Sequence, residues 1–439
     1  MFRKDAVSMA VLGLLASCGL VSAESTAVST PVLSLEPTVV TAQDSSAATT
    51  PLMMGLEKAG VAKPIESEGL QIYGWIEGGY EANLRNNEGS HLSGPITKPG
   101  IFTSDYGNHF VLNQVALRVE RDVDLKKWDV GGMVELNFGV DDNFTTPATA
   151  KDGSHSSGWE LTHIGDNTIA NPQLDVPQAF VDFAIPVGNG IKVRVGRFYT
   201  LTGYESFDPR GNPFYTHSLI YGTEPTENTG VLGFYQINDQ WLIVGGMSRG
   251  INQNTEDNND GTDTIGQVVF TPNKQWTFTG NWEIGPQDNA DNSHYQTLLN
   301  PIASWQMTDQ LKFGGEGIYI YDGGLQGNTG YNGATRNESA YGDVYGAAGY
   351  AQYAINDYLI ANLRVEWLHT YTSPSNENQY EITGGVTIKP MPKDPIGKNL
   401  MIRPEIRYDV AEDHLYPVGT GANSYKDQWS AGADVIFTF

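Results

Sequence analysis

The last eleven residues of the chain, WSAGADVIFTF, alternate between apolar and polar side chains up to the terminal residue. Side chains of a β-strand point alternately to its two faces. One face of this segment is therefore apolar throughout, and the other, apart from Ile436, is small or polar. About eleven residues is also the length of a tilted strand that crosses a bilayer. The pattern predicts a terminal transmembrane strand whose apolar face carries Trp429, Ala431, Ala433, Val435, Phe437 and Phe439.

Several other segments show the same alternation, among them QVALRVER (114–121), WTFTGNWEI (276–284), LIANLRVEW (359–367) and LMIRPEIRYD (400–409). Fifty glycines and 22 tyrosines also indicate a β-rich chain with many turns. A soluble sandwich or propeller would produce similar single strands, because it too has one buried and one exposed face. The spacing of the connections separates these folds.

Short and long connections alternate along the chain. Tight turns are expected near Asp124, Gly188, Asn238, Pro272, Thr308 and Asn356, and a longer Pro-rich turn at KPMPKDPIGKN (389–399). Between them lie polar stretches at about 84–109, 140–175, 198–228, 248–265, 285–296, 322–341, 369–379 and 409–427. Short periplasmic turns and long external loops are typical of outer-membrane barrels. We therefore predict an all-β fold, a transmembrane antiparallel β-barrel of about sixteen strands, with 14 or 18 as alternatives.

The N-terminal region has the layout of a secretory signal peptide, with Arg3 and Lys4 before the apolar run Ala6–Leu15. Two processing sites compete: cleavage after Ala23, or a lipobox that would leave a lipidated Cys18. We expect a signal peptide at 1–23, a flexible Ser/Thr/Pro-rich periplasmic tail at 24–66 with a short helix around 53–60, and a barrel at 67–439. No later segment has 18 consecutive apolar residues.

A barrel of sixteen strands is wide enough to leave an aqueous channel, so its polar faces are candidates for a pore lining. The candidates are Arg118, Glu120, Glu135, Arg194, Glu283, Glu316, Arg364, Glu366, Arg403, Glu405 and Arg407. Opposite charges two residues apart are expected to pair along the wall, as Arg118–Glu120, Arg364–Glu366 and Arg403–Glu405. The formal net charge of −25 argues against nucleic acid as a partner, because phosphate binding needs a basic surface.

Four stretches resemble one known family: IYGWIEGGYEAN (72–83), NQVALRVERDVD (113–124), VPQAFVDFAIPVGNGIKVRVGRFYTLTGYES (176–206) and NPFYTHSLIYGTEPTENTGVL (212–232). They are similar to the OmpL-like β-barrel porins, the second β-barrel porin family. The resemblance extends from about residue 69 to 439. It implies a channel in the cell outer membrane, with outer-membrane lipid and small hydrophilic solutes as partners. Sixteen-stranded porins are commonly homotrimers, which is the assembly that the analogy implies.

The third long connection, 198–228, is unusually rich in aromatic and small residues, unlike Asn/Asp-rich loops such as NQNTEDNNDGTDT (252–264). A loop this apolar is expected to pack against protein. The hypothesis is that it folds into the lumen as a constriction, as the third loop does in general porins; the alternative is that it packs over the barrel rim. The constriction candidates are Tyr199, Tyr204, Phe207, Asp208, Arg210, Phe214 and Tyr215.

Two other classes of function were weighed. GMSRG (246–250) matches the G-x-S-x-G pattern of hydrolases, with Ser248 as nucleophile and a histidine such as His294, His369 or His414 as base. That motif needs a strand-to-helix elbow, and here a strand leads into a loop, so a lipid-hydrolysing barrel enzyme is an alternative only. A secreted all-β adhesin is the other. The eight histidines lack metal-site spacing, and we expect no cofactor, no metal and no catalytic residue.

The terminal aromatic residue has a second implication. A last strand with alternating apolar residues and a final phenylalanine resembles the signal that the outer-membrane barrel-assembly machinery recognises. Phe437 and Phe439 are therefore predicted to be that signal. The sequence as a whole predicts a porin-like channel, not an enzyme, for passive diffusion of small hydrophilic solutes or ions.

Overall fold

The computed structural model describes residues 50–84, 109–145, 162–163, 173–253, 259–287, 291–322, 342–372, 375–417 and 424–439. The chain divides into two units, Met1–Thr30 and Pro31–Phe439, and every described residue belongs to the second. The expected signal peptide and most of the expected tail therefore lie outside the described residues and stay predictions.

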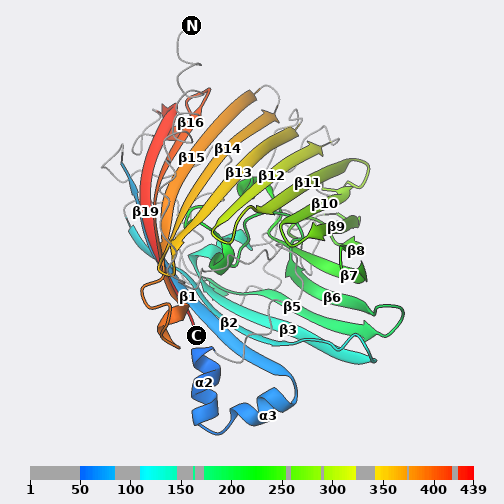
Figure 1. Cartoon of the computed structure of the whole chain (residues 1–439). Coiled ribbons are helices and arrows are strands. Elements are labelled where there is room, and N and C mark those ends of the chain that lie inside the picture. The colour runs from blue at the N-terminus through cyan, green and yellow to red at the C-terminus, as the bar shows by residue number, and fades with distance from the viewer. Residues whose placement is uncertain are drawn as a thin grey trace. The chain divides into compact units, whose positions relative to one another are not determined.

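Sixteen antiparallel strands form one closed sheet, in which the first strand also pairs with the last (Figure 1). They are β1 (Leu70–Asn83), β2 (His109–Arg121), β3 (Asp129–Gly139), β5 (Gln173–Ile185), β6 (Ile191–Tyr199), β7 (Glu227–Asn238), β8 (Trp241–Ser248), β9 (Asp263–Asn273), β10 (Trp276–Pro286), β11 (Tyr295–Gln306), β12 (Leu311–Asp322), β13 (Gly342–Asn356), β14 (Leu359–Thr372), β15 (Ser375–Ile388), β16 (Leu400–Ala411) and β19 (Asp427–Thr438). The predicted barrel and its strand number are confirmed.

Three two-residue strands lie outside this ring. β4 (Thr162–His163) pairs with β5, and β17 (Tyr416–Pro417) pairs with β18 (Ser424–Tyr425). Two short helices, α2 (Pro51–Lys58) and α3 (Ala62–Ser67), precede β1, so the helix expected around 53–60 is present. The Thr50 hydroxyl caps α2 by accepting a hydrogen bond from the backbone N–H of Met53 (3.4 Å). No described helix is long and apolar enough to cross a membrane.

The links between the ring strands are short at one end of the barrel, here called the turn end, and mostly long at the other, the loop end. The turn-end links are residues 122–128, 186–190, 239–240, 274–275, 307–310, 357–358 and 389–399. The predicted long loop at 369–379 was wrong, because β14 continues to Thr372 and β15 begins at Ser375. Tyr371 in this stretch and Tyr380 just after it are exposed on the outer face, as strand residues of a barrel wall are.

Alternation separates the two faces of the barrel wall. On β14, Leu363 is 36% exposed on the outer face, while its neighbour Arg364 is fully buried on the inner face. Exposed aromatic residues gather near both ends of the outer face: Trp128, Trp241, Tyr353 and Tyr358 at the turn end, and Tyr321, Tyr345, Tyr371 and Trp429 at the loop end. An apolar outer band between two aromatic girdles is the pattern of a lipid-facing barrel.

The barrel closes along the seam between β1 and β19. The two strands pair from Trp75 opposite Thr438 to Asn83 opposite Ser430. The terminal residue extends the seam. The backbone N–H of Phe439 donates to the Gly74 carbonyl (2.8 Å), and the N–H of Gly74 donates to the Phe439 carbonyl (2.9 Å). A Cβ at Gly74 would lie 2.7 Å from the Phe439 ring, so the glycine makes room for the aromatic terminus.

Candidate functional site

The link between β6 and β7, residues 200–226, lies inside the ring of strands and is called the inner loop (Figure 1). Its neck is closed by the Thr200 N–H, which donates to the Thr226 carbonyl (3.1 Å). It contains two single-turn helices, η3 (Pro209–Gly211) and η4 (Tyr221–Thr223), and most of its residues are buried. Irregular backbone is tolerated in a barrel only where its polar groups find partners, and the inner wall supplies them.

Carboxylates of the wall accept hydrogen bonds from the backbone N–H groups of the inner loop. Glu366 on β14 accepts from Leu219 and Ile220 (both 2.6 Å). Glu405 on β16 accepts from Tyr215 (2.7 Å), and also from Thr216. Glu316 on β12 accepts from Tyr204 (2.8 Å). Hydrogen bonds to a charged acceptor are about twice as strong as neutral ones, so these three residues hold the loop firmly.

Arginines of the wall bind the carbonyl groups of the same loop. Arg403 on β16 donates to the carbonyls of Pro209 (2.9 Å) and Asn212 (2.6 Å). Arg364 on β14 donates to the Thr216 carbonyl (2.8 Å). Arg407 on β16 donates to the His217 carbonyl. Amide side chains also donate to loop carbonyls: Gln114 of β2 to Phe207, Gln267 of β9 to Leu201, and Asn362 of β14 to Pro213. With Asn300 of β11, which accepts from the Gly203 N–H (3.0 Å), six strands of the wall bind the backbone of the loop.

Most arginines of the inner wall pair with carboxylates on neighbouring strands, whereas Arg407 pairs with Asp409 two residues along β16 (2.7 Å). Arg118 on β2 bonds Glu135 on β3 through Nε (2.9 Å) and Nη2 (2.6 Å). Arg403 bonds Asp434 on β19 (3.1 Å). The predicted same-strand pairs Arg118–Glu120, Arg364–Glu366 and Arg403–Glu405 were therefore wrong. Arg118 lies directly opposite Glu135, and Arg403 lies directly opposite Asp434, where side chains on adjacent strands approach to about 5 Å.

An apolar cluster anchors the inner loop beside its polar contacts with β12 and β14. Leu219 and Ile220 are fully buried against inward-facing residues of β11–β14, which are Leu298, Ile318, Ile320, Val344, Ala348, Tyr350 and Leu368. The Tyr204 ring stacks on Tyr350 with ring centroids 4.2 Å apart. Burying an aliphatic side chain contributes about 1.5–3 kcal/mol, so this cluster adds substantially to the attachment of the loop.

Ion pairs inside the inner loop keep its shape. Glu205 accepts from the Ser218 N–H (3.0 Å) and from Arg364 of the wall (2.7 Å). Burial alone would raise the pKa of Glu205, but the guanidinium of Arg364 and the imidazole of His217 outweigh it and lower the pKa to about 2. Asp208 behaves alike: burial is outweighed by Arg210, and its pKa falls to about 2.

Two carboxyl groups meet where the loop returns to the wall. The amide nitrogen of Asn300 donates to Glu224 of the inner loop and to Glu316 of β12, both at 2.9 Å. Burial, and next the repulsion from Glu316, raise the pKa of Glu224 well above its usual 4.5. The loop is therefore attached here through a carboxyl group that retains its proton at pH values where an exposed glutamate is ionised.

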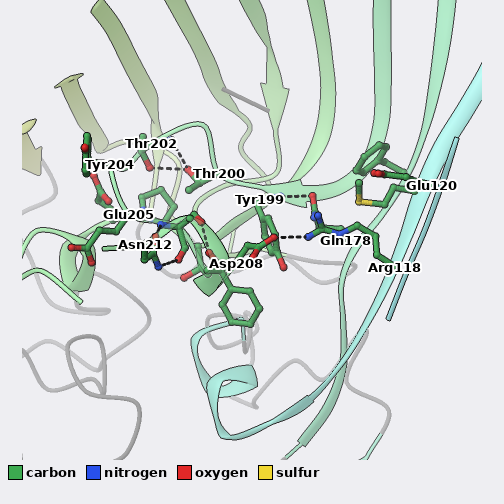
Figure 2. A pocket seen from close by; sticks show the side chains of 18 of the residues that line it. Arg118, Glu120, Gln178, Tyr199, Thr200, Thr202, Tyr204, Glu205, Asp208 and Asn212 are labelled. Carbon is green, nitrogen blue, oxygen red and sulfur yellow. Dashed lines mark hydrogen bonds and ion pairs between the residues drawn. The ribbon is translucent and has the colours of Figure 1, made fainter. Parts of the chain in front are cut away.

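A cavity of about 360 Å³ lies on the turn-end side of the inner loop. Figure 2 shows Tyr204, Glu205 and Asn212 on one side of it, and Arg118 and Glu120 of β2 on the other. Its wall includes Arg121, Asp122, Met133, Gln178, Phe180, Asp182, Lys192, Arg194, Ser304, Lys312 and Gln352. These residues lie toward the turn end of their strands, so the cavity is the part of the lumen nearest that end.

Charges around the cavity are mostly paired across strands. Arg194 on β6 bonds both oxygens of Asp182 on β5 (2.9 Å each), and its guanidinium lies 3.5 Å from the centroid of the Phe180 ring. The Lys192 ammonium lies 3.8 Å from Asp182 and 4.5 Å from the Phe234 ring. The cationic groups are therefore held both by the Asp182 carboxylate and by the faces of aromatic rings.

The structure separates the pore-lining candidates into three groups. Arg118, Glu120 and Arg194 border the cavity. Glu316, Arg364, Glu366, Arg403, Glu405 and Arg407 bind the inner loop. Glu135 is buried between Arg118, Gln178 and the Tyr199 hydroxyl, and Glu283 accepts from Asn228 and Ser248. Their role in a pore stays a prediction.

The constriction candidates also divide. Tyr199, Tyr204, Phe207 and Asp208 border the cavity. Arg210 pairs with Asp208 and lies over the Trp75 ring, 4.3 Å from its centroid. Phe214 and Tyr215 are buried between loop and wall, and Phe214 lies beneath the Arg364 guanidinium. Ser248, the candidate nucleophile, faces Glu283 (3.2 Å), and that carboxylate is its hydrogen-bond partner among the described residues.

Sequence reasoning missed the amide side chains that bind loop carbonyls and the apolar anchor of the loop. A signal for the anchor was present in β12, where Ile318, Tyr319, Ile320 and Tyr321 place apolar side chains on both faces. A strand that is apolar on both faces inside a wide barrel must have an apolar partner in the lumen. The amides Gln114, Gln267 and Asn362 carry no comparable pattern.

The fold and this interior define a class of protein: outer-membrane β-barrels with a lumen that is partly occupied by their own loop. The sequence matches the OmpL-like beta-barrel porin-2 family (BBP2) over residues 69–439, and the chain belongs to this family. It is an outer-membrane porin-type channel protein. No curated protein matches the chain at a significant level.

Solved porin structures are similar in fold. OprB of Pseudomonas putida aligns with a TM-score of 0.53 at 12% identity, over 87% of this chain and 97% of that one. The outer membrane channel DcaP of Acinetobacter baumannii aligns at 0.52 and 12%, over 84% and 97%. Salmonella typhi OmpF aligns at 0.52 and 12%, over 85% and 99%. At these identities the similarity shows the fold alone.

Proposed function

We propose that the chain is a passive channel for small hydrophilic solutes and ions, and that the inner loop sets its width. The observation that carries the proposal is the attachment of this loop: Glu366, Glu405 and Arg403 bind its backbone from two strands of the wall. A loop fixed at this depth leaves only part of the lumen for solutes. The cavity beside it, with a polar and aromatic wall, is the part we assign to the solute path.

Two groups of residues have roles in this proposal. Arg118, Glu120 and Arg194 contact solutes on the barrel wall, opposite Tyr199, Tyr204, Phe207 and Asp208. Arg210, Phe214 and Tyr215 shape the loop without contacting the path. The remaining candidates on the wall (Glu316, Arg364, Glu366, Arg403, Glu405 and Arg407) hold the loop in place, so they act on solutes through its position. Selectivity rings matter only where a pore is narrow.

The proposal is tested by swelling of liposomes that contain the purified protein in solutions of uncharged sugars of increasing size. We expect swelling rates that fall steeply with sugar size, since diffusion through a narrow aqueous path depends on the fit of the solute. Heat-denatured protein is the control for leakage of the vesicles. A correctly folded barrel, identified by its heat-modifiable mobility on gels, that admits none of these sugars and no ions would refute the proposal.

We also propose how the channel is secreted and assembled in the outer membrane. Residues 1–23 direct secretion, residues 24–66 remain periplasmic, and Phe437 with Phe439 is recognised by the barrel-assembly machinery. The bonds between Phe439 and Gly74 at the seam support a role for the terminus in closure. Deletion of Phe439 should lower the amount of assembled barrel several-fold and leave the conductance of assembled molecules unchanged. Equal assembly of the shortened chain would contradict this role.

Mass spectrometry of one purified sample measures both the N-terminal processing site and the oligomeric state. The intact mass of the purified protein distinguishes a chain that starts at Glu24 from one that starts at a lipidated Cys18. Native mass spectrometry of the same sample reports the oligomer, and we propose a homotrimer by analogy with sixteen-stranded porins. A monomer at concentrations where the channel conducts would remove that part of the proposal.

A further inference from the structure

On the loop-end side of the inner loop, the protein carries buried polar side chains that have no protein partner. Gln379 of β15, Gln428 of β19 and Tyr416 of β17 are at most 2% exposed. Both side-chain polar atoms of each glutamine, and the Tyr416 hydroxyl, make no hydrogen bond among the described residues. The large majority of buried polar atoms in proteins are hydrogen-bonded. Five exceptions in one region therefore indicate a place where another molecule supplies the partners.

Strand pairing brings these side chains to one part of the inner wall. The strands β15, β16 and β19 are neighbours in the sheet (Figure 1). Asp409 of β16 lies directly opposite Glu381 of β15 and Gln428 of β19. Gln379 lies two residues before Glu381, so it points to the same face. Tyr416 has Asp409 as a charged neighbour. The two amides and the phenol thus surround the inward face of β16 near the loop end.

The charged groups of this region are only partly occupied by each other. Asp409 is bonded by the Arg407 guanidinium (2.7 Å), which also donates to the His217 carbonyl of the inner loop. Glu377 lies two residues before Gln379 on the same face of β15. One of its carboxylate oxygens accepts a backbone N–H (2.9 Å), and the other makes no hydrogen bond among the described residues. One ion pair is therefore complete, and one carboxylate oxygen is left as an acceptor.

The chemistry of the unpartnered atoms selects a class of ligand. The set consists of Gln379, Gln428, Tyr416 and Glu377, and is called the amide site. Its two amide nitrogens donate only, whereas the amide oxygens and the remaining Glu377 oxygen accept only. An ammonium group cannot accept from the amides, and an ionised carboxylate or phosphate cannot donate to the acceptors. A hydroxyl group does both.

We propose that the amide site binds a neutral saccharide at the loop-end side of the inner loop. Sugar hydroxyls accept from the amide nitrogens of Gln379 and Gln428 and donate to their oxygens and to Glu377. Arg407 connects this region to the inner loop, so the saccharide is held directly before the constriction. This inference rests on the proposed channel function and names a class of solute for it.

Isothermal titration calorimetry of the purified, folded barrel tests the site, in a detergent without a sugar headgroup. The probes are glucose, sucrose and maltose, with putrescine and succinate as charged controls. We expect saturable binding of at least one sugar and of neither charged compound. Water also donates and accepts hydrogen bonds, and ordered water alone would satisfy the same atoms. The absence of saturable binding for all three sugars would establish water as the occupant and overturn the proposal.

Variants locate the binding. Gln379→Leu/Gln428→Leu should weaken sugar binding by about 30-fold, and Tyr416→Phe by about fivefold, because each removes net hydrogen bonds to a neutral ligand. The matched control is Gln306→Leu, a buried glutamine of β11 at the turn end whose amide nitrogen donates to the Thr308 carbonyl (2.7 Å). It should bind sugar as the wild type does. Wild-type affinity in the double variant would overturn the proposal.

Thermal unfolding separates a ligand site from a structural role. Because the two amides have no protein partner, Gln379→Leu/Gln428→Leu should unfold without sugar at the wild-type temperature or above it. It should lose the rise in unfolding temperature that bound sugar gives the wild type. A variant that is destabilised without sugar and still stabilised by sugar would assign the amides to the structure and overturn the site.

The site and the channel fail in distinguishable ways. A barrel that conducts ions and admits sugars, yet binds none of them saturably, would remove the amide site and keep the channel. A barrel that binds sugar through Gln379 and Gln428, yet conducts nothing in planar bilayers, would support the site and refute the channel.

Discussion

The two sides of the lumen use the same residue types in different ways. Where the inner loop is attached, arginines and glutamates of β14 and β16 bind its backbone, so each charged side chain has a partner in the loop. Around the cavity, Arg194 and Asp182 bond each other across β5 and β6. Charge alone therefore does not identify a pore lining. The partner of each charge shows whether it binds the inner loop or pairs within the wall.

Removal of Arg364 should have the largest effect on the stability of the protein. Arg364→Ala leaves Glu381 and Glu205 without their guanidinium partner in a buried position, which costs about 3–5 kcal/mol. The free energy of unfolding, measured by denaturant titration in lipid vesicles, should fall by that amount. Arg194→Ala also removes a buried arginine, but from the cavity side, where the inner loop would keep its contacts. Equal conductance in the two variants would contradict the distinction between arginines that hold the inner loop and arginines that border the cavity.

The apolar anchor gives the next largest effect. Leu298 faces inward and is fully buried in the cluster that receives Leu219, while its neighbour Leu299 is 43% exposed on the outer face. Leu298→Ala should destabilise the protein by about 2–5 kcal/mol, because it leaves a cavity beside the loop. Leu299→Ala is the matched control and should cost well under half of that. Similar losses in thermal unfolding for both variants would contradict the assignment of the cluster.

A smaller effect is expected from Glu366→Gln. The N–H groups of Leu219 and Ile220 bond different carboxylate oxygens, and the amide offers one acceptor oxygen and one NH2 donor, so one bond is lost and about 1.5–3 kcal/mol of attachment is at stake. The variant should show more frequent changes of current level in single-channel recordings, as the loop detaches. Glu120→Gln, which borders the cavity and accepts from the Tyr73 hydroxyl, should leave the current steady. A steady current in Glu366→Gln with frequent changes of current level in Glu120→Gln would contradict the role of Glu366 in holding the loop.

The smallest effect concerns pH. The pKa of Glu224 is raised by burial and by Glu316, with Glu205 and Glu366 as further acidic neighbours. The protonated form is therefore the one that the folded loop favours. Its stabilisation is fully present below pH about 4.5 and is lost as pH rises through the folded-state pKa. Conductance should rise with pH over that interval, and Glu224→Gln should remove the rise. An unaltered pH profile in the variant would show that another group titrates.

The barrel could be predicted from the sequence because strand periodicity and link length are local properties. QVALRVER and LIANLRVEW show their faces directly, and the terminal phenylalanine lies where the seam closes. The link at 369–379 could not be placed, because its sequence HTYTSPSNENQ is mostly polar and includes a proline, which is the composition of a loop.

The interior was less accessible to prediction, since it depends on contacts between distant segments. Glu205 and Arg364 are 159 residues apart, and Arg403 reaches a carbonyl 194 residues away. The apolar character of residues 198–228 indicated that the loop packs against something, but no local pattern indicates which wall residues meet its backbone. The cross-strand pairing of Arg118 with Glu135 depends on register, which alternation alone does not fix.

Single-channel conductance in planar bilayers, recorded for the wild type and for Arg364→Ala and Arg194→Ala, tests the central claim most directly. The wild type should open in discrete steps. Arg364→Ala should show a larger conductance, because the inner loop no longer holds its position, while Arg194→Ala should stay closer to the wild-type value. A folded wild-type barrel that conducts no ions would contradict the channel. An Arg364→Ala conductance equal to that of the wild type would contradict the role of the inner loop as its constriction.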